Sequence, residues 1–177
     1  MLPEPECDGL PERIEDADFR GLYRYWDERR GDRFAPRRDE IDPLDLVPLI
    51  GDLLLIDVVR EGTGAPPRFR FRLHGTRLTE RAGYDMTGRF AEELPYRENR
   101  EQLLARFASL VAQRRPEYGL HDRIVDFQRW RYEVLWLPLA NGGGDEVAML
   151  LGAMRYRDTV KTATPLAPEQ RETLEGD

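Results

Sequence analysis

The chain has 177 residues, of which 40% are hydrophobic and 10% aromatic, and its formal net charge is −7. This length suits one domain whose core needs neither disulfides nor metals for stability, and the clustered apolar residues argue against disorder. The acidic balance argues against a nucleic-acid binder, which needs a concentrated basic face.

The N-terminal sequence and the single cysteine indicate a cytoplasmic protein. Cys7 cannot form an internal disulfide, which fits a reducing compartment. The first sixteen residues lack the basic and apolar regions of a secretory signal. The sequence also lacks the run of about 18 apolar residues that a membrane-spanning helix needs.

An amphipathic helix is predicted near the N-terminus, after a proline-rich and acidic stretch, residues 1–17, that we expect to be a flexible leader. Asp18 is the expected N-cap of this helix and Gly31 its stop. Spacings of i, i+3, i+4 and i+7 place four apolar residues on one face. That face must be covered by the domain's own sheet or by a second copy of the chain. The dimer-interface candidates are therefore Phe19, Leu22, Tyr23 and Trp26.

A short helix and a hairpin are predicted next. Asp42 followed by Pro43 is typical of a helix start, and this helix should end before Gly51. Residues 53–59 are apolar at almost every position, which predicts a strand buried on both faces. Residues 69–74 alternate apolar and charged, which predicts a second strand paired with the first.

The alternation in this second strand predicts where its histidine points. His74 has the parity of Arg70 and Arg72, so we expect it to face away from the side that carries Phe71 and Leu73.

The second half of the chain predicts one long helix and three strands. Apolar spacing indicates a helix over residues 99–113. Strands are expected over residues 117–124, 129–139 and 146–156, and the last should lie beside the 53–59 strand in the middle of the sheet. Two strands, a helical crossover and three strands indicate an α+β domain with one antiparallel sheet.

Several segments, taken in order, resemble the PAS domain family. They are FRFRLHGT at 69–76, GYDMTG at 83–88 and WLPLA at 136–140, preceded by YW at 25–26, PRR at 36–38, IDP at 41–43 and LIGDLLLIDV at 49–58. The upstream segments are similar to a group of stand-alone bacterial PAS-like proteins.

The resemblance implies a five-stranded antiparallel sheet with helices on one face around a small cavity, and an added N-terminal amphipathic helix. It implies a single domain over residues 18–160, followed by a flexible tail over 161–177. Its members are sensory or protein-interaction modules, often homodimers through the N-terminal helix. The resemblance thus implies a non-enzymatic module that signals through a separate output protein.

The sequence offers no catalytic, metal or cofactor set. Ser109 lies within the predicted long helix, away from any strand-to-helix elbow. His74 and His121 lack clustered metal-ligand spacing, and the predicted orientation of His74 disfavours haem. Flavin photochemistry of the PAS type would need a cysteine near the cavity, and Cys7 is not placed for it.

A cavity between sheet and helices would hold an unidentified small ligand, although the same residues could simply fill the core. The pocket candidates are Phe71, Leu73, Leu78, Tyr84, Met86, Phe107 and Trp136. The alternative is a small isomerase-like α+β enzyme that uses Asp57 or Tyr84 in this cavity. Asp57 is the only acid in an apolar strand, and the enzyme interpretation fails if arginines cap it.

Overall fold

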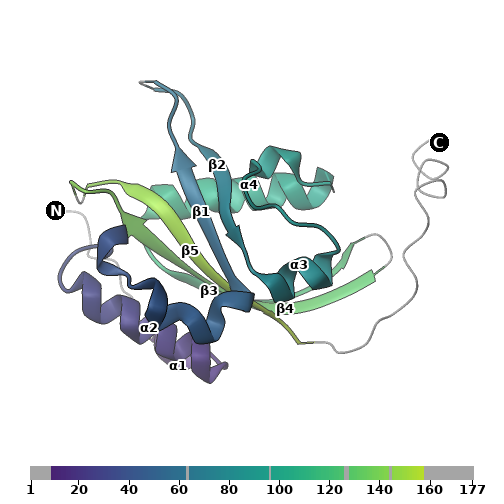
Figure 1. Cartoon of the computed structure of the whole chain (residues 1–177), viewed down its shortest axis with the longest axis horizontal. Helices are drawn as coiled ribbons and strands as arrows, with labels where there is room; N and C mark the ends of the chain where they lie inside the picture. Colours follow the sequence, from purple (N-terminus) through teal and green to yellow (C-terminus); the bar gives the residue numbers. More distant parts are fainter. Residues whose placement is uncertain (1–8, 63, 96, 126–127, 144, 158–177) are drawn as a thin grey trace.

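The protein is built on a five-stranded antiparallel sheet in the order β2-β1-β5-β4-β3 (Figure 1). The computed structural model describes residues 9–157 apart from 63, 96, 126–127 and 144, so the predicted tail, 161–177, lies outside the described residues. The strands are β1 (Leu53–Val59), β2 (Arg68–His74), β3 (Glu117–Val125), β4 (Gln128–Ala140) and β5 (Val147–Tyr156).

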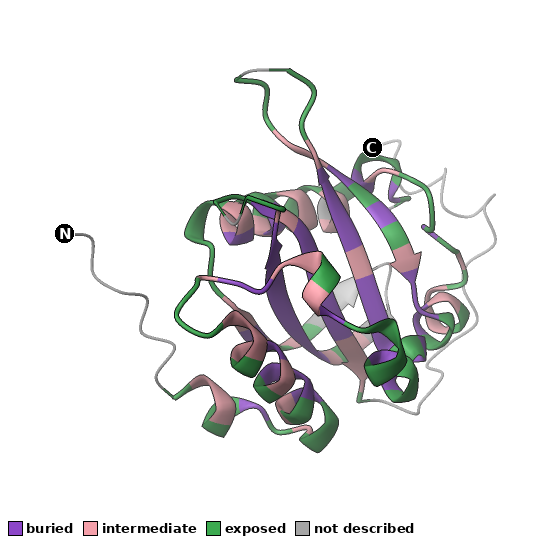
Figure 2. Ribbon diagram, turned by 60° about the vertical axis from the view of Figure 1, so that its left-hand side comes forward, coloured by how far each residue is buried: buried purple, intermediate pink, exposed green. Residues whose placement is uncertain are grey.

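Helices cover both faces of this sheet, and the buried residues concentrate between them (Figure 2). One face is covered by α1 (Leu10–Arg13), α2 (Ala17–Arg30) and the 3₁₀ helix η2 (Pro43–Asp52). The other face is covered by α3 (Thr76–Ala82) and α4 (Arg97–Gln113). Two short 3₁₀ helices, η1 (Arg38–Glu40) and η3 (Ala91–Glu93), complete the set. The predicted α+β fold with an added N-terminal helix is confirmed.

The packed domain begins earlier than predicted. Asp16, and not Asp18, caps α2: its Oδ1 accepts hydrogen bonds from the backbone N–H groups of Asp18 at 2.9 Å and Phe19 at 3.1 Å. Ile14 is completely buried in the core. The described part of the predicted leader is therefore part of the domain.

The aromatic face of α2 packs on the sheet of its own chain. Phe19 and Trp26 are completely buried, and Leu22 and Tyr23 are almost so. Trp26 Nε1 donates a 2.7 Å hydrogen bond to the buried carbonyl of Pro138 on β4. These four side chains cannot also contact a second copy, so their prediction as dimer-interface residues is wrong.

A β-bulge in β2 overturns the predicted orientation of His74. Leu55 pairs with Leu73 but Ile56 pairs with Phe71, so Arg72 is an extra residue. An extra residue reverses the alternation beyond it. Leu73 consequently packs in the core under α2, while His74 turns toward the α4 side.

We predict that Trp26→Phe lowers the free energy of unfolding by about 1–3 kcal/mol, because the Pro138 carbonyl would stay buried without a donor. Urea denaturation would measure the loss. Arg24→Ala, on the exposed side of the same helix, should stay within about 0.5 kcal/mol of the native protein. Equal effects of the two substitutions would contradict the role given to Trp26.

Candidate functional site

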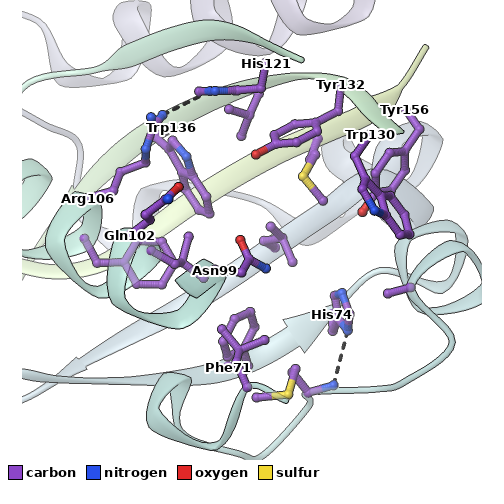
Figure 3. A pocket seen from close by; sticks show the side chains of 18 of the residues that line it. Phe71, His74, Asn99, Gln102, Arg106, His121, Trp130, Tyr132, Trp136 and Tyr156 are labelled. Atoms are coloured by element: carbon purple, nitrogen blue, oxygen red, sulfur yellow. Dashed lines mark hydrogen bonds between the residues drawn. The ribbon is translucent and has the colours of Figure 1, made fainter. Parts of the chain in front are cut away.

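A cavity of about 140 Å³ lies between the sheet and α4 (Figure 3). Its floor is a cluster of rings from three elements: Phe71 on β2, Phe107 on α4 and Trp136 on β4. The Phe107 and Trp136 rings meet edge to face with centroids 5.1 Å apart, and Phe71 lies edge-on to Phe107 at 6.5 Å.

The room for Trp136 comes from a glycine on the neighbouring strand. Gly152 pairs directly with Trp136 across β4 and β5. A Cβ at Gly152 would lie 2.3 Å from Cζ3 of the indole, far inside van der Waals contact. The indole can therefore lie flat on the sheet only because residue 152 has no side chain.

Five of the seven predicted pocket residues line the cavity: Phe71, Tyr84, Met86, Phe107 and Trp136. Leu73 and Leu78 do not. Leu73 faces the opposite core because of the bulge, and Leu78 is buried in the packing of α3. Among the other five, Tyr84 is half-buried, and its ring centroid lies 6.3 Å from that of His74.

His74 is a cavity residue that the sequence pattern placed on the wrong side. Its side chain is 7% exposed, and its Nδ1 accepts a 3.2 Å hydrogen bond from the backbone N–H of Met86. Burial lowers the pKa of the imidazole, and the Asp85 carboxylate, 3.8 Å from Nδ1, opposes this only in part. His74 is thus held as a neutral imidazole.

A second polar group lies between α4 and β3. Arg106 donates from Nη1 to Glu117 at 2.6 Å and approaches His121 Nε2 at 3.2 Å. Because a guanidinium can only donate, His121 Nε2 accepts. The His121 ring stacks on Tyr132 at 4.9 Å, on the cavity side of the sheet. The sequence did not predict the register of β3, the strand that carries His121. The pairing of β3 with β4 defines this register.

An aromatic wall formed by Trp130 and Tyr156 separates the cavity from Arg81. The Arg81 guanidinium lies 5.0 Å from the centroid of Trp130 and 5.5 Å from that of Tyr156. Burial raises the pKa of the Tyr156 hydroxyl, so it stays protonated. The aromatic wall therefore offers neutral rings to the cavity.

Asp57 lies on the opposite face of the sheet from the cavity. Its Oδ2 accepts from Arg70 Nη2 at 3.0 Å and its Oδ1 from Arg72 Nε at 2.8 Å. The two arginines lie two residues apart on β2, on the same face of the sheet as Asp57. Among the described lining residues of the cavity there is no aspartate or glutamate. The prediction that Asp57 could act as a catalytic acid in this cavity is therefore wrong, whereas Tyr84, the other residue named for an enzyme, does line the cavity.

The buried carboxylate of Asp52 connects helix α3, which lies next to the cavity, to the N-terminal helix α2. Asp52, at the end of η2, accepts from Arg77 Nε at 2.7 Å and from Arg155 Nη2 at 2.8 Å. Arg155 also binds Asp16, the cap of α2. Burial alone would lower the pKa of Arg155, but its bonds to Asp52 and the charge of Asp16 raise it. This set of four, the Asp52 network, connects α3, β5 and α2.

The described ranges contain no group of three or more histidine, cysteine or acidic side chains arranged to hold a metal ion. No helix there is long and apolar enough to cross a membrane. The cytoplasmic location stays a prediction.

A model of the PAS domain family matches residues 15–155. No curated protein sequence gives a significant match. Among solved structures, the PAS domain of BvgS from Bordetella pertussis is 14% identical, with a TM-score of 0.48 over 76% of this chain and 96% of that chain. A light-oxygen-voltage domain studied with a flavin analogue is 12% identical, with a TM-score of 0.45 over 75% and 89%. Both likenesses are distant and carry no argument about function.

We predict that acid destabilises the protein through His74. The pKa of His74 is lowered in the folded state, so the unfolded chain takes up the proton first as the pH falls below about 6.5. This contribution to the free energy of unfolding is complete above that pH and decreases below it. Urea denaturation from pH 7.5 to 5.5 should show a smaller decrease for His74→Gln than for the native chain. Parallel curves would contradict the buried, neutral state of His74.

Proposed function

The chain belongs to the PAS domain family, and from this premise we propose that it is a non-enzymatic sensory module that binds a small molecule in its cavity and signals through a separate protein. The observation that carries the proposal is the cavity itself. Its walls are aromatic, but buried His74 and half-buried Asn99 also face it. A cavity that only served packing would be expected to be apolar throughout.

We propose that the module works without haem. To bind iron through the nitrogen that faces the cavity, His74 would need a lone pair on Nε2 and the proton on Nδ1. The Met86 N–H already points at Nδ1, so a proton there would meet a second donor. The donor set therefore does not fit an axial iron ligand. Cys7, considered for flavin chemistry, lies outside the described residues.

The Asp52 network is the proposed route from the cavity to the surface. Helix α3 begins two residues after His74, and its Arg77 binds Asp52. Asp52 binds Arg155, which pairs with the cap of α2. A shift of α3 on ligand binding would change these bonds, because buried ion pairs lose much energy when one partner moves away.

The predicted homodimer needs a surface other than α2, and we propose an apolar ridge on η2. Side chains three residues apart align in a 3₁₀ helix. One row of η2 is buried, whereas the row of Leu44, Val47 and Ile50 is 76%, 53% and 51% exposed. We define these three side chains as the η2 ridge.

A second copy of the chain fits the η2 ridge by symmetry and charge. A two-fold axis at Val47 would place Leu44 of one copy against Ile50 of the other. Exposed Asp45 lies at the Leu44 end, and Arg77 lies against Gly51 at the Ile50 end. The same axis would bring the acid of each copy toward the arginine of the other.

We predict that Gly152→Ala abolishes small-molecule binding, because the new methyl group pushes Trp136 into the cavity. The protein would be incubated with a small-molecule extract of its host cells and examined by native mass spectrometry. Gly21→Ala is the matched control, since a Cβ at Gly21 meets nothing within 4 Å. The native chain and Gly21→Ala should retain the same added mass. An added mass absent from the native chain, or retained by Gly152→Ala, would contradict the proposal.

We predict that Val47→Glu weakens self-association at least tenfold, because it buries a charge at the centre of the proposed interface. Sedimentation equilibrium would measure the dimer dissociation constant. Leu120→Glu provides the control, since Leu120 is equally exposed on β3, away from the η2 ridge. A native chain that stays monomeric, or equal effects of the two substitutions, would contradict the dimer.

A further inference from the structure

The hydrogen bond from Met86 fixes the tautomer of His74. A backbone N–H can only donate, so Nδ1 of His74 carries a lone pair. A neutral imidazole with a lone pair on Nδ1 carries its proton on Nε2. The Thr79 hydroxyl, 3.4 Å from Nδ1, can donate to the same lone pair. The Met86 N–H and the Thr79 hydroxyl therefore favour an N–H group at Nε2, and the exposed Asp85 carboxylate, at 3.8 Å, lies beyond hydrogen-bond distance of Nδ1.

This Nε2–H group has no hydrogen-bond partner in the described part of the chain. The side chain is more than nine-tenths buried, and it lines the cavity. Figure 3 shows the ring between the Met86 backbone and the cavity, with its second nitrogen directed into the cavity. Because this N–H group opens onto the cavity, its hydrogen-bond acceptor must come from a molecule that occupies the cavity.

The amide of Asn99 supplies a second unmatched polar group. Asn99 lies on the first turns of α4, is half-buried and projects into the same cavity (Figure 3). The described residues give it no hydrogen bond. An amide offers both a donor and an acceptor, so it complements a group that has both.

The cavity favours a neutral ring. Its volume of about 140 Å³ is close to that of an engineered protein cavity that holds benzene. The one guanidinium among its described lining residues, Arg106, is paired with Glu117. A buried carboxylate would therefore find no uncompensated positive charge in the cavity.

We propose that the cavity binds a neutral one-ring aromatic compound whose carbonyl oxygen accepts from His74 Nε2 and whose adjacent polar group pairs with Asn99. The ring lies against Phe71, Phe107 and Trp136, where edge and face contacts add to its burial. This inference rests on the proposed function, because it names the chemical class of the ligand for the same cavity.

Benzamide, benzoate and toluene distinguish the three classes of ligand. Benzamide carries a ring, a carbonyl oxygen and a donor; benzoate has a charge, and toluene has only the ring. Amide chemical shifts of the ¹⁵N-labelled full chain, titrated with each compound, give the dissociation constants and show where each binds. We expect benzamide to bind in the cavity and at least tenfold more tightly than either of the others.

Substitutions assign the contacts. Asn99→Leu should weaken benzamide about tenfold and leave toluene unchanged, whereas Gln113→Leu, on an exposed position of the same helix, should change neither. His74→Phe keeps a ring and should also lose the preference for benzamide over toluene. If that variant does not fold, Asn99→Leu alone decides.

The outcomes separate this inference from the proposed function. Equal binding of toluene and benzamide, or tighter binding of benzoate, would overturn the ligand class while the cavity remained a binding site. Retention of a host compound by the native chain, together with no shifts at the lining residues for all three probes, would overturn the ligand class as well. No retained compound and no shifts would overturn both.

Discussion

One extra residue in an edge strand determines much of the geometry of this domain. Because Arg72 has no partner on β1, the strand changes face between Phe71 and Leu73. The change sends Leu73 to the core under α2 and His74 into the cavity. Arg70 and Arg72, two residues apart, both bind Asp57 on the face opposite the cavity. The bulge thus explains why a histidine, and not a leucine, of this strand faces the cavity.

The second constraint is that the sheet is buried on both faces. The strand β1 places Leu53 under α2 and Leu54 beside the cavity, and neighbouring β5 behaves in the same way. A sheet with two apolar faces needs two helical layers. The N-terminal helix α2 supplies the second layer, and Trp26 fixes it by a hydrogen bond to β4. The added helix is therefore a structural requirement of this sheet.

The sequence predicted the elements well because most of them have strong periodicity. The apolar runs of β1 and β5 correctly predicted central strands. The errors have local physical causes. A β-bulge does not change the alternation of residue types along the sequence, so the pattern predicted the wrong face of the sheet for His74. Asp16 and Asp18 are both suitable caps, and only the backbone geometry at Asp16 distinguishes them. The polar residues Asn99 and His121 reach the cavity from two different elements. Their proximity depends on how these elements pack in the tertiary structure, which local sequence spacing does not predict.

The Asp52 network consists of aspartates and arginines, and Lys161 is the only lysine in the whole sequence. A guanidinium keeps its charge at every pH that a cell experiences, and lysine acetylation cannot remove it. The positive charges that connect α3, β5 and α2 are consequently permanent. Acylating enzymes cannot remove them, so the arginine side of this connection changes only when one of the three elements moves.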